Sequence, residues 1–186
     1  RSINKSIVLI YSSSDKAYGE VKKKFYKENS KLDAIFPYDV SKSSSDLICQ
    51  SYSKTYNLKI GIIRCANIYG PHDYNFRRIV PETIISALLK KKLIIRSSGK
   101  LKREYVFVDD VADAYYRIFN FLKSSKKLCK IYNIGSGTNY NVIQIVNKIN
   151  SFFKIKNFFK IKNYSNKEII TQKLNYDKLT KETGWT

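Results

Sequence analysis

Short apolar runs alternate with amphipathic stretches along the chain. The runs at residues 6–11 (SIVLIY), 59–64 (KIGIIR) and 130–134 (KIYNI) are continuous and rich in β-branched side chains, a pattern that predicts buried strands. Between the first two runs, apolar positions recur at a roughly helical period over residues 38–56, which predicts a long helix. Strand, helix and strand in this order predict a βαβ unit and therefore a parallel sheet.

The rest of the chain continues in the same alternating manner, and no internal repeat is found. Residues 12–19 (SSSDKAYG) and 66–75 (ANIYGPHDYN) predict loops, and the charged, irregular residues 20–34 predict a surface excursion. A Lys/Asn-rich stretch after residue 153 is weakly patterned. Further helices are predicted over residues 79–92, from about 109, over 141–153 and over 176–182, and further strands over 93–96 and 105–108.

The composition is that of a globular domain. With 186 residues, 43% hydrophobic and 14% aromatic, the chain is able to bury a core. No apolar run approaches the length of a membrane-spanning helix, so no membrane partner is expected. The three cysteines, Cys49, Cys65 and Cys129, are odd in number and lack CxxC or Cys/His spacing. This argues against disulfides and against a metal site, and it indicates a reducing, cytoplasmic setting.

The formal net charge of +20 permits nucleic-acid binding on charge alone. However, 28 of the 35 basic residues are Lys, and they occur along the chain together with many Ile and Asn. This pattern is typical of a broad compositional bias. No specific nucleic-acid partner is therefore expected.

Tyr38 and Lys42 lie four residues apart at the start of the long predicted helix, so both side chains lie on one helix face. An ammonium group beside a phenol stabilises the phenolate, which allows a tyrosine to act as an acid or a base. Because Tyr and Lys are both abundant here, a solvated helix face is the commoner explanation of this spacing in isolation.

Three further motifs lie next to predicted strands, whose ends bind ligands in parallel sheets. After the first strand, SSSDKAYG places the Ser14 hydroxyl, Asp15 and Lys16 together. RCANIYGP offers the Asn67 amide to a phosphate or a sugar hydroxyl, and REYVFVDDV places Arg103 ahead of a strand, where it suits a pyrophosphate. Taken singly, each motif fits a polar loop, a helix cap or a structural ion pair equally well.

Taken together and in this order, the motifs resemble the extended short-chain dehydrogenase/reductase family, in particular its NAD-dependent nucleotide-sugar epimerases and dehydratases. SSSDKAYG is similar to the family's S-S/T-x-x-x-Y-G, and YDVSK is similar to Y-x-x-S-K. RCANIYGP is similar to R-x-x-N-x-Y-G-P, and REYVFVDDVADA to R-D-Y-x-x-V-x-D-x-A. NIGSG and TKETGWT also fit, so the resemblance covers nearly the whole chain.

The resemblance implies an α/β fold: the C-terminal part of a Rossmann-like doubly wound parallel sheet, plus a smaller α/β substrate-binding region. Residues 1–70 and 103–135 would belong to the sheet, and residues 71–102 and 136–186 to the substrate-binding region. The family's N-terminal glycine-rich βαβ unit, which binds the cofactor pyrophosphate, is missing, as is the acidic residue that selects NAD over NADP. We therefore expect a fragment that is inactive as it stands.

The resemblance also implies roles for individual residues. A tyrosine would remove a sugar hydroxyl proton while hydride passes to NAD, and a lysine would bind the nicotinamide ribose. The implied catalytic residues are Ser14, Asp15, Lys16, Tyr38 and Lys42; the implied cofactor contacts are Ser12, Tyr38, Lys42 and Cys65; the implied nucleotide-sugar contacts are Asn67, Arg78 and Arg103.

The two residues after Ser14 distinguish branches of the family. Dehydratases place an acid and a base there, commonly Asp-Glu, to remove water across C5 and C6 of a 4-keto sugar, whereas 4-epimerases have small or apolar residues. Asp15-Lys16 therefore favours a 4,6-dehydratase, and with NFRRIVP at residues 75–81 it most resembles the CDP-glucose 4,6-dehydratase group. Lys16 would have to be neutral to act as the base. A 4-epimerase or reductase is the alternative within the family, and an inactive fragment or a basic binding module is the alternative of another class.

The family often dimerises through the helix that bears the Tyr-x-x-x-Lys motif. Leu47, Ile48 and Tyr52 share a helix face that suits either the core or a homodimer contact. His72, the only histidine, lies in a predicted loop near the site and is given no catalytic role.

Overall fold

Three parallel strands form the main sheet. The structure is a computed structural model that describes residues 7–20, 25–156, 158–164 and 169–186. The strands β1 (Val8–Ser14), β2 (Lys59–Cys65) and β6 (Cys129–Ile134) lie in the order β1-β2-β6. Helix α1 (Pro37–Tyr56) carries the chain from the end of β1 back to the start of β2, which makes the two strands parallel. The predicted βαβ unit is confirmed.

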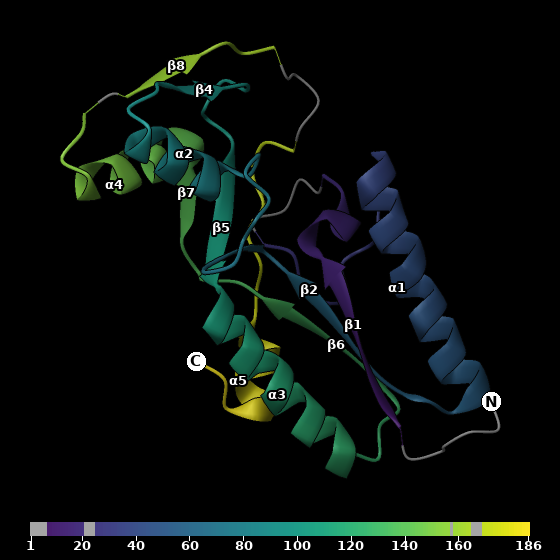
Figure 1. Ribbon diagram of the computed structural model, residues 1–186. Coiled ribbons are helices and arrows are strands. Elements are labelled where there is room, and N and C mark those ends of the chain that lie inside the picture. The colour runs from purple at the N-terminus through teal and green to yellow at the C-terminus, as the bar shows by residue number, and fades with distance from the viewer. Residues whose placement is uncertain (1–6, 21–24, 157, 165–168) are drawn as a thin grey trace.

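Helices lie on both sides of this sheet, with α1 on one side and α3 (Val108–Ser124) on the other (Figure 1). Buried Ile118 and Leu122 of α3 pack over Gly61 of β2, where even a Cβ atom would come within 2.7 Å of a Leu122 methyl carbon. Glycine at this position therefore sets how closely α3 approaches the sheet. A short helix, α5 (Asp177–Thr183), packs against α3 and β6.

A second, smaller part of the molecule extends beyond the carboxyl ends of these strands. Strand β5 (Lys102–Phe107) pairs in parallel with β3 (Asn67–Tyr69) and antiparallel with β7 (Asn139–Asn141). Farther out, α2 (Ile79–Leu88) packs against α4 (Val142–Phe152), and β4 (Leu93–Ile95) pairs in parallel with β8 (Phe159–Ile161) (Figure 1).

The serine-rich segment after the first apolar run differs from the expected loop. Strand β1 continues to Ser14, because residues 12–14 pair in register with residues 63–65 of β2. A 3-10 helix, η1 (Asp15–Tyr18), then follows directly. The Ser14 hydroxyl caps this helix by accepting a hydrogen bond from the backbone N–H of Lys16 (3.2 Å). The polar side chains are therefore held on regular backbone.

The charged segment predicted as a surface excursion, residues 20–34, is tied to the core at one point in its described part. In the described part of this segment, Tyr26 is 2% exposed and belongs to the main core. Its hydroxyl donates to the Gly19 carbonyl oxygen (3.0 Å), and its backbone N–H donates to Lys173 O (2.9 Å). Lys27, Asn29, Lys31 and Asp33 are exposed as predicted, so the described part of the segment lies on the surface and one buried aromatic ring anchors it.

Candidate functional site

A cavity of about 500 Å³ opens at the carboxyl ends of β1 and β2, where Ser14 pairs with Cys65. This is the edge at which parallel sheets bind ligands. Residues from β1, η1, α1, the end of β2, β3 and the start of α2 line it. Nine of the ten residues implied by the sequence lie in its wall: Ser12, Ser14, Asp15, Lys16, Tyr38, Lys42, Cys65, Asn67 and Arg78.

Tyr38 and Lys42 lie in the first turns of α1, which starts at Pro37 because the fixed φ of proline suits a first helical position. The Lys42 Nζ donates to the backbone carbonyl oxygen of Ser12 (2.9 Å) and lies 5.9 Å from the centre of the Tyr38 ring. This contact fixes the lysine to the end of β1. Tyr38 is 57% exposed, so its ring is open to a ligand in the cavity.

Asp15 is 3% exposed, although it lies in the cavity wall. The Ser14 hydroxyl donates to its Oδ1 (3.1 Å). Burial raises the pKa of the Asp15 carboxyl, although the charges of Lys16 and Arg103 and the hydrogen bond from Ser14 act in the opposite direction. A carboxyl in this setting is suited to hold a proton and to release it to a leaving group.

Three further residues in the wall come from the end of β2, the start of β3 and the N-terminus of α2. Burial raises the pKa of the Cys65 thiol, so this thiol favours its neutral form. The Asn67 side-chain amide donates to the carbonyl oxygen of Glu104 (3.2 Å), which links β3 to β5. Arg78 is the N-cap residue of α2, and its Nη1 lies 3.4 Å from Asp73 Oδ2.

Arg103 is the one implied site residue that is not in the cavity wall. It is 7% exposed, and its Nη1 donates to the carbonyl oxygens of Lys102 (2.8 Å) and Ile170 (3.5 Å). Tyr105, two residues later on the same strand, lies in the wall instead. The charge of Arg103 opposes the effect of burial on Asp15 and Asp39, whose pKa values are nevertheless raised.

A buried ion pair that the sequence analysis did not single out holds α1 to the sheet. The Arg64 Nε and Nη2 donate to the two carboxylate oxygens of Asp46 (2.8 and 2.9 Å). The Ser13 hydroxyl and the Gln50 amide donate to the same carboxylate (3.0 and 2.7 Å). Asp46 follows Lys42 by one helical turn. An arginine within an apolar strand was the feature of the sequence that could have indicated this ion pair. The Asp46–Arg64 ion pair fixes the position of α1 relative to the end of β1, which Lys42 contacts.

Two other buried carboxyl groups near the site were also missed. Burial raises the pKa of Asp39, although the charges of Lys16 and Arg103 oppose the shift. Burial also raises the pKa of Glu104, although it accepts hydrogen bonds from the backbone N–H groups of Leu174 (2.6 Å) and Gly137 (2.8 Å). Local sequence gave no signal for either, because both positions also suit solvated acids.

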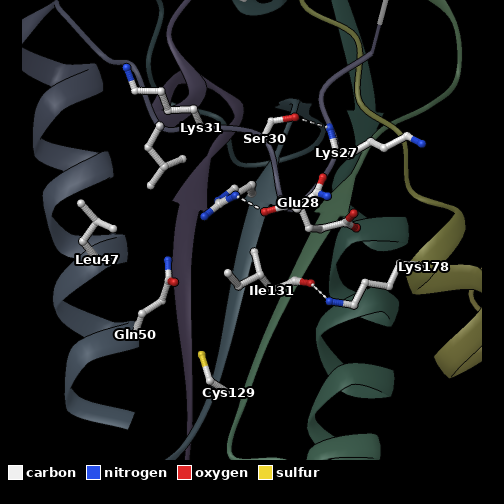
Figure 2. Close-up of a pocket in the computed structure, with 12 residues that line it drawn as sticks. Lys27, Glu28, Ser30, Lys31, Leu47, Gln50, Cys129, Ile131 and Lys178 are labelled. Atoms are coloured by element: carbon white, nitrogen blue, oxygen red, sulfur yellow. Dashed lines mark hydrogen bonds between the residues drawn. The ribbon is translucent and has the colours of Figure 1, made fainter. Parts of the chain in front are cut away.

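A larger depression of about 890 Å³ lies elsewhere, on the α1 side of the sheet (Figure 2). Residues 27–32, α1, β6 and α5 line it, and none of the implied site residues does. Its polar groups are largely engaged within the protein: Lys178 Nζ donates to Ile131 O (2.7 Å), and Ser30 Oγ accepts from the Lys27 N–H (2.9 Å). The smaller cavity at the strand ends is therefore the candidate site.

A model of the NAD-dependent epimerase/dehydratase family matches residues 2–135. The chain belongs to this family. dTDP-D-glucose 4,6-dehydratase from Homo sapiens is 32% identical over 140 residues, which are 75% of this chain and 39% of the human protein.

Solved structures agree with this assignment. dTDP-glucose 4,6-dehydratase from Bacillus anthracis in complex with NAD has a TM-score of 0.86 at 29% identity, covering 96% of this chain and 56% of that one. UDP-glucose 4-epimerase from Thermotoga maritima with UDP-glucose has a TM-score of 0.85 at 27% identity, covering 95% and 57%. The Rossmann-like α/β fold is thus confirmed, and the chain spans less than two thirds of each relative.

Within the described residues, no group of three or more His, Cys, Asp or Glu side chains is arranged to hold a metal ion. In the same part of the chain, no helix is both long and apolar enough to cross a bilayer.

Proposed function

We propose that the chain is the catalytic part of an NAD-dependent nucleotide-sugar 4,6-dehydratase. The observation that carries this proposal is the presence of Asp15 and Lys16 in the same cavity as Tyr38 and Lys42. A 4-epimerase needs only the second pair, whereas loss of water needs an additional acid and base. The 4,6-dehydratase activity named for the relatives in Homo sapiens and Bacillus anthracis supports the same reaction.

The cavity fits the nicotinamide half of NAD. Lys42 offers an ammonium and Tyr38 a phenol to ribose hydroxyl groups, and Ser12 and Cys65 border the same space. NAD supplies a hydride acceptor for C4 of the sugar when it is bound. The glycine-rich turn that holds the pyrophosphate in this family is not part of this sequence, so these residues provide one half of the cofactor site.

Tyr38 starts the reaction by accepting the proton of the C4 hydroxyl as that carbon is oxidised. The Ser14 hydroxyl, on the adjoining strand end, shares this proton through a hydrogen bond. Lys42, fixed to the Ser12 carbonyl oxygen, holds its ammonium group 5.9 Å from the centre of the Tyr38 ring, in the same cavity.

Asp15 and Lys16 carry out the elimination. A ketone at C4 acidifies the C5–H bond, so Lys16 removes the C5 proton while Asp15 donates a proton to the departing C6 hydroxyl. Burial raises the pKa of Asp15, which keeps its proton available for that step. Lys16 then returns the proton to C5, and the reduced cofactor, when bound, would supply the hydride at C6 that completes the 4-keto-6-deoxy sugar.

Asn67 and Arg78 are the proposed nucleotide-sugar contacts, and residues 71–102 and 136–186 the proposed substrate-binding region. Arg103 is proposed to favour the ionised form of Asp15 through its charge. Asp15-Lys16 and residues 75–81 resemble the CDP-glucose 4,6-dehydratase group, so CDP-glucose is the first candidate substrate. The relatives make dTDP-glucose and UDP-glucose the next candidates.

The full-length protein is proposed to be a cytoplasmic homodimer. Leu47, Ile48 and Tyr52 of α1 are 52–56% exposed and therefore do not belong to the core. This face suits the helix-to-helix contact through which the family dimerises. The three cysteines are free, which fits a reducing compartment.

The decisive experiment uses the full-length protein that contains this chain, incubated with NAD and CDP-, dTDP- or UDP-glucose. Absorbance of the 4-keto product in alkali measures dehydration. Tyr38→Phe should lower turnover by about 10²–10⁴-fold, the usual contribution of a general acid-base group. Tyr116→Phe, at an exposed tyrosine of α3 that does not line the cavity, is the control and should retain full turnover.

Asp15→Asn separates the two steps. This variant should still oxidise C4, seen as NADH absorbance, but form almost no 4-keto-6-deoxy product. An inverted C4 centre without a keto product would instead establish the 4-epimerase alternative, which the Thermotoga maritima relative supports. Absence of both products with every nucleotide-glucose tested would overturn the enzyme proposal in favour of an inactive fragment or a basic binding module.

A further inference from the structure

Positive charge is unevenly distributed over the fold. Residues 84–100 and 142–164 contain ten Lys or Arg and no Asp or Glu, although the whole chain has 15 acidic residues. These segments form the C-terminal half of α2 with β4, α4 and β8, which lie at one end of the molecule, away from the β1-β2-β6 sheet (Figure 1). Glu82, in the first turn of α2, lies outside them and pairs with Arg96 (2.8 Å). The two segments therefore carry +10 of the net charge of +20.

The C-terminal ends of α2 and α4 lie together in this unit. Each helix leads through a short connection into one strand of the β4–β8 pair, and these strands start side by side. The backbone N–H of Leu93 donates to the carbonyl oxygen of Phe158 (3.2 Å) at that start. Residues that follow the two helices therefore share one outer surface.

This surface, which we name the basic tip, combines exposed apolar groups with lysines. Leu88 is 63% exposed, Leu89 is 59% exposed and Phe152 is 84% exposed. All the lysines next to them in the sequence are exposed as well. The basic tip consists of Leu88, Leu89, Lys90, Lys91, Lys92, Phe152, Lys154 and Lys156.

Two residues beyond the end of each helix lies a lysine in a conformation that favours glycine. Lys90 has φ 53° and Lys154 has φ 57°, in the left-handed region. The residue after each of them donates to the carbonyl oxygen five positions earlier, the hydrogen bond of a Schellman motif, whose left-handed position is usually glycine. Lysine therefore occupies two positions where glycine would fit the backbone with less strain.

We propose that the basic tip docks on a membrane surface that contains anionic lipids. The leucine and phenylalanine side chains suit the boundary between headgroups and acyl chains, and the surrounding lysines suit the anionic headgroups. No acidic residue in these two segments opposes that attraction.

A lipid surface is favoured over nucleic acid by the apolar part of the tip. Nucleic acid would contact the lysines through phosphate and could stack a base on Phe152, but it offers no apolar phase to Leu88 and Leu89.

The test uses the purified full-length protein and co-sedimentation with vesicles. Binding is expected to vesicles of phosphatidylcholine mixed with phosphatidylglycerol, to weaken with added salt, and to be absent with pure phosphatidylcholine. Lys90→Gly with Lys154→Gly removes two charges at positions where glycine relieves backbone strain, so the fold is retained. Binding of this variant should weaken by about 30-fold, from roughly a fivefold contribution per lysine.

Two further variants test whether vesicle binding depends on the position of the lysines and on the exposed apolar side chains. Lys126→Gln with Lys127→Gln removes the same charge from exposed residues after α3 and should leave vesicle binding unchanged. Phe152→Ser changes a side chain that is 84% exposed and whose ring centre lies 5.6 Å from that of Phe153, and it should weaken binding about tenfold or more. The proposal is overturned if the mixed vesicles do not bind, if the two lysine pairs weaken binding equally, or if Phe152→Ser binds as tightly as the unaltered protein. The last outcome would indicate a general polyanion site.

Discussion

The buried ion pair between Asp46 and Arg64 should contribute most to holding α1 on the sheet. The Asp46 side chain is 0% exposed and the Arg64 side chain 2% exposed. Asp46→Ala would leave the guanidinium buried, with the Glu28 carbonyl oxygen at 3.0 Å and the Tyr18 ring as its remaining partners. Removing one partner of a buried pair costs about 3–5 kcal/mol, a large share of the ~5–15 kcal/mol that stabilises a typical domain.

Urea unfolding followed by fluorescence of Trp185, the only tryptophan, measures this loss. The expected fall in Tm is roughly 10 °C for a chain of this length. The matched control is Asp113→Ala, which breaks an Arg–Asp contact of similar length, 2.7 Å, between side chains that are 41% and 47% exposed. That change should cost less than about 1 kcal/mol, because water solvates the separated charges.

A double variant isolates the cause. Asp46→Leu with Arg64→Met removes both charges and fills much of the same volume, so it should recover most of the stability lost in Asp46→Ala. The reasoning is refuted if Asp46→Ala costs no more than Asp113→Ala. It is also refuted if the double variant is less stable than Asp46→Ala, since the loss would then come from packing.

Three smaller changes test other parts of the structure. Burial raises the pKa of Asp39, so the folded protein binds the Asp39 proton more tightly than the unfolded chain does. The stability that this proton contributes is present below the ordinary aspartate pKa and is lost as the pH rises through the raised pKa of the folded protein. Asp39→Asn should therefore gain Tm relative to the unaltered protein as pH rises, and a constant difference would contradict this. Burial opposes ionisation of Glu182, but hydrogen bonds from Lys130 and Tyr132 outweigh burial and lower the pKa of Glu182. Glu182→Gln should therefore be most destabilising near neutral pH, and the destabilisation should disappear in acid. Gly19 has φ 66°, and a Cβ there would lie 2.1 Å from the Asp33 carbonyl oxygen; Gly19→Ala should lower stability by more than ~1 kcal/mol, and an unchanged Tm would contradict that contact.

Much of the site follows from local sequence, because its parts lie at the ends of regular elements. The helical period of residues 38–56 places Tyr38 and Lys42 on one face, and apolar runs place Ser14 and Asn67 at or just beyond strand ends. In a parallel sheet those strand ends meet at one edge, so order along the chain is enough to predict that they come together.

Tertiary structure decided which side chains are buried and which face water. Tyr26 is in the core and Arg103 in the interior, whereas Leu47 and Ile48 are exposed, although their local patterns did not distinguish these outcomes. The same holds for the Asp46–Arg64 pair and for the basic tip, which join residues far apart in the sequence. Periodicity reports which side of its own helix or strand a residue occupies. Burial and charge pairing depend on which other segment covers that side, and only the folded chain determines this.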